Sequence, residues 1–261
     1  MDLNFRGKRA VVCGSTQGIG KACALELASL GASITLIARN ETKLKSVVKE
    51  MDARSDQDHN YLVADFAFPD QLKKVIGDFA LTNVVHILVN NTGGPPAGLA
   101  IDAAPEQYLN AFQSHLLCNQ ILAQAFVEGM KAEKYGRIIN IISTSVKTPI
   151  RGLGVSNTIR GAVANWSKTV SVELGPFGIT VNNVLPGATM TQRLQSVMKE
   201  KAEQAGKTLE VMKQEMIADI PAGRISEPFE VAAAVAFLAS PAASYINGIN
   251  VPVDGGRTSS L

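Results

Sequence analysis

Three glycines, Gly14, Gly18 and Gly20, stand at a spacing that suits phosphate binding, in the stretch GSTQGIG. Glycine permits a positive φ and lets backbone N–H groups approach a phosphate closely. A helix that begins near Ile19 would direct its positive end at the same phosphate. A tight turn alone also needs glycines, but the apolar run before this stretch and the helical pattern after it favour a dinucleotide site.

The residue that ends the second apolar run bears on which dinucleotide would bind. Arg39 stands there, where an acidic side chain would hydrogen-bond the ribose hydroxyls of NAD. An arginine accommodates the 2′-phosphate of NADP, which a carboxylate would repel. The alternative is an exposed arginine at the start of a helix. We therefore expect NADP as the cofactor, with NAD as the less favoured choice.

A second group of polar residues follows an apolar run in the middle of the chain. Ser143, Thr144 and Ser145 place three hydroxyls where a strand would end, and Lys147 and Arg151 come shortly after. The hydroxyls either cap a turn or hydrogen-bond a substrate. The two cations either lie in solvent, which we favour, or bind an anionic substrate.

An alternation of strand and helix patterns must position these residues. Short runs rich in Val and Ile with flanking glycines indicate strands, and longer helical patterns separate them. This order predicts a parallel sheet with helices on both faces, in a single-domain Rossmann-type α/β fold of about seven strands over residues 1–261. The strand candidates are RAVVCG, SITLIAR, NYLVADF, VHILVNN, GRIINIIS, ITVNNVLPG and GINVPVDGG, and the helix candidates are Ile19–Leu30, Glu41–Met51, Pro69–Phe79, Pro105–Lys131, Val155–Glu173 and Phe229–Leu238.

Residues 189–222 break this rhythm. They are rich in Lys and Glu with spaced apolar residues, which predicts one or two amphipathic helices joined near Gly206. A surface helical hairpin and a mobile lid over a ligand site both fit the pattern. We favour the lid, because the segment follows the carboxyl end of a strand, where open α/β sheets bind ligands.

Composition argues against several other classes of protein. The 261 residues are 46% hydrophobic, and the net charge of +2 gives no charge-driven attraction to nucleic acid or to an anionic membrane. The apolar runs are shorter than the roughly 20 residues that span a bilayer, and the N-terminus lacks signal-peptide features, so the cytoplasm is the expected compartment. Three cysteines (Cys13, Cys23, Cys118) and three histidines lack metal-ligand spacing, so we expect no metal site.

Taken together, these motifs resemble those of the short-chain dehydrogenase/reductase family, from about Arg9 to Gly256, and within it the 3-oxoacyl-ACP-reductase-like group. The motifs that carry the resemblance are GSTQGIG, ADF, NNTGG with Thr92 in place of an alanine, LPGATMT, IPAGRISEPFEVAAAVAFLAS and INGINVPVDGG. The resemblance implies hydride transfer between NADP(H) and a carbonyl or alcohol substrate, with acyl thioesters among the candidates. It also implies a homotetramer that pairs through the helices Pro105–Lys131 and Val155–Glu173.

The resemblance also places the cofactor contacts on particular residues of this chain. They belong to the glycine turn, the ends of the next strands and the Pro-Gly motif. The residues are Gly14, Ser15, Gln17, Gly18, Ile19, Gly20, Arg39, Asp65, Phe66, Asn91, Gly93, Arg160, Pro186, Gly187, Thr189 and Thr191.

The catalytic positions depart from the family pattern of serine, tyrosine, lysine and asparagine. Ser143 holds the serine position, whereas Ser156, Arg160 and His115 stand where the tyrosine, lysine and asparagine belong. A serine hydroxyl is a far weaker acid than a tyrosine, and an arginine with a pKa above ~12 does not exchange a proton. His115 is the candidate proton source, because histidine ordinarily titrates near neutral pH. The alternative is a histidine satisfied by a neighbour on a buried helix face.

Two kinds of function stay open at this point. The first is an NADP-dependent oxidoreductase with an unusual proton donor, favoured because Ser143 and Thr191 would serve the nicotinamide end. The second is an inactive nucleotide-binding protein, either a sensor or scaffold or the partner subunit of an active relative. The joint change at Ser156, Arg160 and His115 favours the second, or a new substrate.

Overall fold

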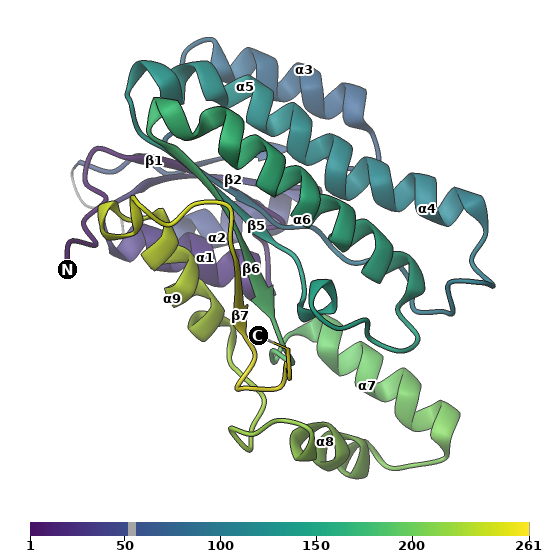
Figure 1. The fold of residues 1–261 in the computed structure, drawn as a ribbon. Helices are drawn as coiled ribbons and strands as arrows, with labels where there is room; N and C mark the ends of the chain where they lie inside the picture. Colours follow the sequence, from purple (N-terminus) through teal and green to yellow (C-terminus); the bar gives the residue numbers. More distant parts are fainter. Residues whose placement is uncertain (52–55, 261) are drawn as a thin grey trace.

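The computed structural model describes residues 1–51 and 56–260, and its centre is one parallel sheet. Seven strands lie in the order β3-β2-β1-β4-β5-β6-β7 (Figure 1), which confirms the predicted doubly wound α/β fold. The strands are β1 Arg9–Cys13, β2 Ser33–Ala38, β3 Asn60–Val63, β4 Ile87–Asn90, β5 Gly136–Ile141, β6 Ile179–Pro186 and β7 Asn250–Val253.

The strands β4 and β5 are buried along their whole length because helices cover both faces of the sheet. All four residues of β4 and all six of β5 are buried. The strand order reverses between β1 and β4, which pair directly. Open α/β sheets bind ligands in the crevice outside such a reversal, so the fold points to the loops that follow β1 and β4.

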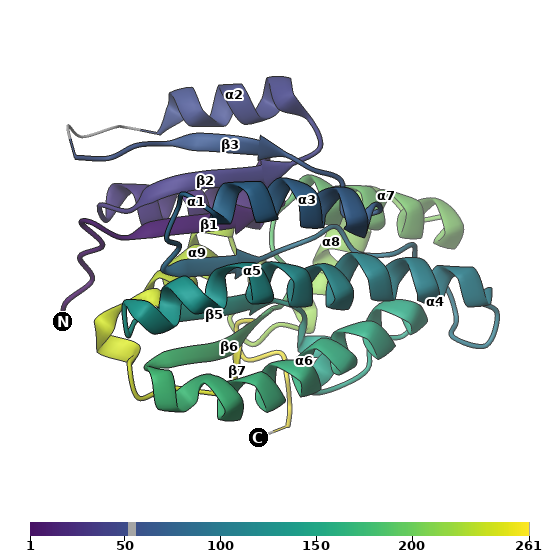
Figure 2. The same cartoon turned by 90° about the horizontal axis from the view of Figure 1, so that it is seen from above.

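The helices form two layers, one on each face of the sheet (Figure 2). Each layer presents an apolar stripe to the strands, as a half-buried helix must. One layer contains α1 Gly18–Ser29, α2 Glu41–Glu50 and α9 Pro228–Ala239, and the other contains α3 Pro69–Ala80, α4 Pro105–Phe112, α5 Cys118–Ala132 and α6 Gly154–Leu174.

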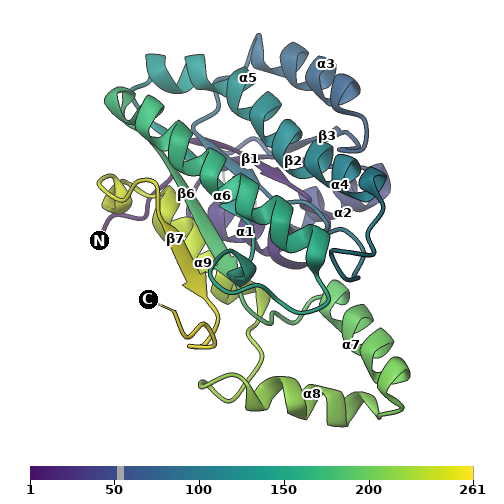
Figure 3. The ribbon, with the colours of Figure 1, turned by 45° about the vertical axis from the view of Figure 1, so that its right-hand side comes forward.

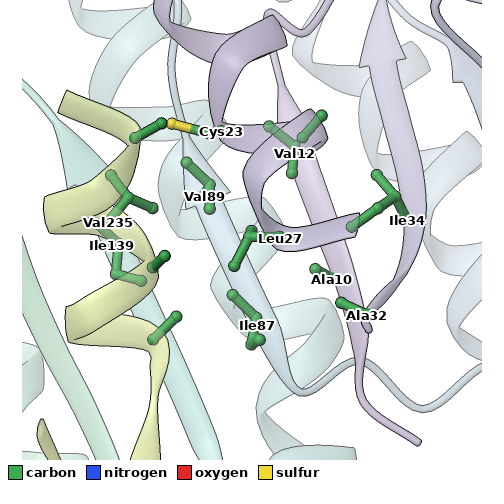
Figure 4. Close-up of a cluster of buried hydrophobic side chains, with 14 of the residues drawn as sticks. Ala10, Val12, Cys23, Leu27, Ala32, Ile34, Ile87, Val89, Ile139 and Val235 are labelled. Atoms are coloured by element: carbon green, nitrogen blue, oxygen red, sulfur yellow. The ribbon is translucent and has the colours of Figure 1, made fainter. Parts of the chain in front are cut away.

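The larger apolar core lies between α1, α9 and the sheet (Figure 4). Cys23 and Leu27 from α1 meet Val235 from α9 and Ile139 from β5, and all four are buried. The opposite face has its own core around Leu72, Phe126 and Val181, among others. The three cysteines are free and buried.

A row of asparagines crosses the sheet within this apolar interior. Asn90, Asn140, Asn183 and Asn250 are register partners on β4, β5, β6 and β7. Each side-chain Nδ2 donates to the Oδ1 of the next residue in this order, at 2.8, 3.0 and 2.8 Å. Buried amides in an apolar core are costly unless hydrogen-bonded, and the row gives each of its first three amides an acceptor, although Oδ1 of Asn90 has no partner.

The segment after β6 forms two helices that project beyond the ends of β6 and β7 (Figures 1 and 3). These are α7 Gln192–Ala205 and α8 Leu209–Ala218, and Gly206, with φ at +63°, ends α7. Met198 on the inner face of α7 packs in a cluster with Ala188 and Ile220, and Ala202 is also buried, while α8 has no buried residue. The expected pair of helices joined near Gly206 is present, and its motion as a lid stays a prediction.

Candidate active site

The glycine turn after β1 is defined by contacts between backbone atoms. Gly14 has φ at +57°, and its N–H donates to the carbonyl of Ile37 at 2.9 Å. Gly20, in the first turn of α1, packs directly on the carbonyl oxygen of Gly14. A Cβ on Gly20 would overlap that oxygen and would lie 2.6 Å from Nδ2 of Asn91. The close approach of α1 to β1 therefore requires glycine at this position.

Two other elements hold the turn in place. Asn91, just after β4, donates from Nδ2 to the carbonyls of Cys13 and Gly14 at 3.3 and 3.2 Å. Thr191 caps α7 by accepting from the N–H of Leu194 at 3.2 Å, and its methyl group would lie 3.2 Å from a Cβ on Gly18. The structure thus brings the predicted Gly14, Gly18, Gly20, Asn91 and Thr191 together.

The start of α1 is free to bind an anion. Its N-cap residue, Gln17, makes no capping hydrogen bond through its side chain, and the first turn has no acidic residue. Uncapped N–H groups and the positive end of the helix dipole favour a phosphate here. A hollow of about 600 Å³ lies alongside, lined in part by Thr16, Gln17, Gly18 and Thr191. These residues fit a dinucleotide.

Ser15 lies in the same turn, but its side chain faces away from the surface. It is fully buried, and its hydroxyl donates to the carbonyl of Ile37 at 3.4 Å. Ile19 is partly buried in the larger core. A contact from either residue to a cofactor would therefore come from the backbone N–H.

Arg39 and Asp65 lie side by side at the ends of β2 and β3. Their Nη1 and Oδ2 atoms are 3.7 Å apart, and the Arg39 side chain is 76% exposed. Asp65 also accepts from the N–H of Ala67 at 3.0 Å, and the carbonyl of Phe66 accepts from Sγ of Cys118 at 3.4 Å. An exposed cation at this strand end is available to a 2′-phosphate.

The serine after β5 keeps its hydroxyl hydrogen available. Ser143 caps the short helix Thr144–Val146, and its Oγ accepts from the N–H of Ser145 at 3.0 Å. A hydroxyl that accepts from the backbone still has one O–H to donate. Ser143 can therefore hydrogen-bond a substrate oxygen.

Ser156 and Arg160 form a pair one turn apart on α6. Nε of Arg160 donates to Oγ of Ser156 at 3.2 Å, and Nη1 donates to the carbonyl of Ile141 at 3.2 Å. Nη2 lies against the backbone of Gly94, 3.5 Å from where a Cβ would stand. Burial and the nearby charge of Arg193 lower the pKa of Arg160 to about 10, so the guanidinium stays charged at neutral pH.

His115 sits in a π-helical segment, Gln113–Leu117, that interrupts the helix expected over Pro105–Lys131. Such wide turns often mark functional sites. The ring is 5% exposed, and its Nδ1 lies 2.6 Å from Oγ1 of Thr92. We refer to Thr92, His115, Ser143, Ser156 and Arg160 as the polar rim.

The expectation that His115 titrates near neutral pH is wrong. Burial, and next the positive charge of Arg160, lower the pKa of His115 from 6.5 to about 3, although a hydrogen bond to the Gly93 backbone acts in the opposite direction. A cation is disfavoured both in an apolar setting and beside another cation. His115 is therefore neutral at pH 7 and holds no proton that it could release near neutrality.

The Pro-Gly segment after β6 is fixed by β7 and by the start of α9. The N–H of Gly187 donates to the carbonyl of Val253 at 3.0 Å, and a Cβ on Gly187 would lie 2.7 Å from Cβ of Asp254. Thr189 is buried, and its Oγ1 accepts from Oγ of Ser226 at 3.0 Å. Pro186, the last residue of β6, pairs with Val253.

Two residues that sequence reasoning did not select belong to this site. Thr92 was noted only as a departure from an alanine, although a polar residue at that position signals a partner. Arg193, in the first turn of α7, donates from Nη2 to the carbonyl of Pro95 at 3.1 Å. In the described part of the chain, no group of three or more His, Cys, Asp or Glu side chains is arranged to hold a metal, and no helix is long and apolar enough to cross a membrane.

Comparison with known proteins gives consistent matches along the whole chain. A family model described as Enoyl-(Acyl carrier protein) reductase matches residues 14–258. The 3-oxoacyl-(acyl-carrier-protein) reductases FabG of Haemophilus influenzae and Vibrio cholerae are each 32% identical, over 252 and 259 residues. Both matches cover 97% of this chain and 98% of the relative.

Solved structures agree with the sequence matches. L-sorbose reductase from Gluconobacter frateurii, complexed with NADPH and L-sorbose, superimposes with a TM-score of 0.93 at 29% identity, over all of both chains. YwfH, an NADPH dependent reductase involved in bacilysin biosynthesis, gives a TM-score of 0.91 at 28% identity, over 97% of this chain and 99% of its own.

The parallel sheet, its reversal at β1 and β4 and the glycine turn define a Rossmann-type nucleotide-binding protein. The matches to known proteins identify the family within this class. The chain belongs to the short-chain dehydrogenase/reductase family.

Proposed function

We propose that the protein is an NADP-dependent oxidoreductase that interconverts a carbonyl and an alcohol. Its family membership supports oxidoreductase chemistry, and two similar proteins use or bind NADPH: YwfH is an NADPH dependent reductase, and L-sorbose reductase is complexed with NADPH. The uncapped start of α1 would hold the pyrophosphate, and Arg39 would hold the 2′-phosphate. The bound nicotinamide supplies or accepts the hydride.

The observation that carries the reaction is the hydrogen bond from Arg160 to Ser156. Because Oγ of Ser156 accepts from the guanidinium, its own hydrogen is left to donate to a substrate oxygen. The hydroxyl of Ser143 likewise accepts a hydrogen bond, from the N–H of Ser145, and keeps its own hydrogen to donate. Two hydroxyls would thus orient the carbonyl, and the fixed positive charge of Arg160 would stabilise the alkoxide that forms as hydride arrives.

The proton for that alkoxide would come from water held at the two serines. Neither serine is acidic enough to act as the tyrosine of the family does, and the pKa of Arg160, at about 10, keeps its proton in place at neutral pH. General acid catalysis is worth typically 10²–10⁴-fold, so hydride transfer without it is slower but survives. His115 would act through position, because its bond to Thr92 fixes the loop that carries Gly93 and Gly94.

One observation favours a second function, that of an inactive nucleotide-binding protein. In the polar rim, neither His115, with a pKa of about 3, nor Arg160, with a pKa of about 10, titrates near neutrality. A site without a neutral-range acid lacks the usual proton source of a reductase. The two functions differ in whether NADPH, once bound, is ever consumed.

The test measures NADPH binding and NADPH oxidation with ketones and 3-oxoacyl thioesters, in the natural chain and in two variants. Ser156→Ala should lower kcat while NADPH affinity stays within about twofold, because the serine contacts the substrate. Ser156→Tyr with Arg160→Lys should raise turnover by up to the 10²–10⁴-fold that acid catalysis supplies. If all three bind NADPH and none turns over any substrate, the inactive nucleotide-binding function stands.

We also propose that the chain assembles as a homotetramer. Leu109 and Phe112 on α4 are 62% and 43% exposed, and Val172 on α6 is 69% exposed. Phe126 on α5 and Val163 on α6 are buried in the core of the chain and take no part in such a surface. Exposed apolar side chains on two neighbouring helices favour burial against another copy. Sedimentation at micromolar concentration tests this, and a monomer would contradict it.

A further inference from the structure

The walls of the polar rim carry an excess of positive charge that the sequence alone makes plain. Three segments carry or adjoin its residues: residues 90–101 after β4, residues 141–160 from the end of β5 to Arg160 on α6, and residues 186–199 leading into α7. None of them contains an Asp or a Glu. Their basic residues are Lys147, Arg151, Arg160, Arg193 and Lys199.

Two of these cations meet at a single loop. Nη2 of Arg160 lies against Gly94, and Nη2 of Arg193 donates to the carbonyl of Pro95, the next residue. Arg160 comes from α6 and Arg193 from the first turn of α7. The body of the molecule and the helical segment 189–222 thus each contribute one guanidinium to the same few ångströms of backbone.

Neither guanidinium is neutralised by the chain. Across residues 1–51 and 56–260, no carboxylate lies within 4.0 Å of Arg160 or Arg193. Their hydrogen bonds go instead to a hydroxyl and to backbone carbonyls. Two adjacent like charges repel, and burial of part of Arg160 strengthens that repulsion. An anion between them would satisfy both forks.

The contacts of the proposed cofactor do not account for this arrangement. The uncapped turn of α1 and Arg39 already provide for its phosphates, and they lie at the ends of β1 and β2. A single cation at position 160 would suffice for ribose hydroxyls. Arg193 contacts the residue that follows Gly94, so its positive charge lies near that of Arg160 and adds to it.

We propose, on the basis of the proposed function, that the substrate carries an oxyanion, either a carboxylate or a phosphate, that binds at Arg193 and Arg160 while Ser143 and Ser156 hold its carbonyl. Arg193 is then a specificity residue, through which the helical segment 189–222 favours substrates that carry a negative charge.

The experiment compares charged and neutral carbonyl compounds as matched pairs. The pairs are pyruvate, acetoacetate and levulinate, each with its methyl ester, and dihydroxyacetone phosphate with dihydroxyacetone. The measured quantity is the ratio of kcat/KM for the charged member to that for the neutral member. A preference of tenfold or more for an acid over its ester identifies a carboxylate, and the same preference in the last pair identifies a phosphate. Preference for the neutral member in every pair overturns the proposal.

Three variants assign the preference to Arg193. Arg193→Gln should lower the ratio roughly 10- to 100-fold, the usual size of a lost charge-assisted hydrogen bond. Arg193→Lys keeps the charge without the fork and should retain part of the preference. Lys201→Gln removes the same charge two turns further along α7, at an exposed residue, and should leave the ratio unchanged. If Arg193→Gln lowers kcat/KM equally for both members of a pair, Arg193 only positions the 94–95 loop, and the proposal is overturned.

A binding measurement separates this proposal from the proposed function. Isothermal titration of the NADP-loaded protein with the same acids and esters requires no turnover. Binding of an acid or of the phosphate that Arg193→Gln weakens, in a protein that oxidises no NADPH, would support the anion site and reject the reductase. Turnover of neutral ketones together with no anion binding would do the reverse.

Discussion

The glycine turn after β1 and the polar rim lie at the ends of neighbouring strands, but different contacts hold them. In the turn, Gly20 rests on the carbonyl of Gly14, so a backbone atom occupies the place of a side chain. In the rim, side chains hold one another, as Arg160 holds Ser156 and Thr92 holds His115. A turn of the first kind dictates its residue types, whereas a rim of the second kind can change its members together and still be satisfied.

The largest effect should come from filling the space in the turn. Gly20→Ala places a methyl group on the Gly14 carbonyl and beside Asn91. We expect the free energy of unfolding to fall by about 3 kcal/mol, as in severe overpacking, and NADPH binding to weaken as α1 shifts. Urea unfolding and fluorescence titration measure the two effects. Gly77→Ala is the control, because nothing lies within 4 Å of that Cβ and alanine favours a helix by about 0.5–1 kcal/mol.

For the polar rim, the expected effect is a loss of stability at acidic pH. With its pKa lowered from 6.5 to about 3, His115 binds a proton more weakly in the fold than in the unfolded chain. Its contribution to stability is complete above pH 6.5 and is lost as the pH falls from there toward 3. Between pH 7 and pH 4.5 the natural chain should lose about 2–3 kcal/mol more than His115→Asn does.

Urea unfolding of both proteins across this range measures the difference, and parallel curves would show that His115 is not neutralised by the fold. The rate of carbonyl reduction should show no ionisation of His115 between about pH 5 and 9. An inflection in that range that disappears in His115→Asn would restore His115 as the proton source.

Charge reversal at Arg39 tests the cofactor end of the turn. Arg39→Asp should shift the ratio of NADPH to NADH affinity toward NADH by roughly 10- to 100-fold, because it replaces an attraction to the 2′-phosphate with a repulsion. Arg6→Asp is the matched control, because Arg6 is also exposed and also paired with an aspartate, Asp56, at 3.8 Å. Equal affinities of the natural chain for the two cofactors would contradict the role of Arg39.

The smallest effect should come from breaking one rim contact. Thr92→Val keeps the shape of the side chain but leaves Nδ1 of buried His115 without its 2.6 Å partner. We expect Thr92→Val to lower the free energy of unfolding by about 1–2 kcal/mol. Thr92→Ser keeps the hydroxyl and should therefore keep most of that stability. Thermal unfolding of the three proteins decides this, and no difference between the valine and serine variants would remove Thr92 from the rim.

The same contrast explains what could be foreseen from the sequence. The sheet, its flanking helices and the contacts of Gly14, Gly18 and Gly20 follow from local patterns, because backbone geometry restricts which residues fit. A buried His115 satisfied by a neighbour was one of the two alternatives, but the fall in its pKa could not be foreseen, because it depends on burial and on Arg160, 45 positions away in the chain. Arg193 was hidden for a similar reason: its loop partner, Pro95, is far from it in sequence.

The hydrogen bonds in the row of asparagines all run in one direction, since the amides of Asn90, Asn140 and Asn183 each donate toward β7. If the amide of Asn140 or Asn183 were turned over, its oxygen would face the oxygen of one neighbour and its nitrogen would face the nitrogen of the other. A single substitution in the middle likewise strands both neighbours. A substitution at one of these sites is therefore unfavourable unless an adjacent site changes with it. In proteins that diverge from this chain, we expect the four asparagines to be kept together or replaced together.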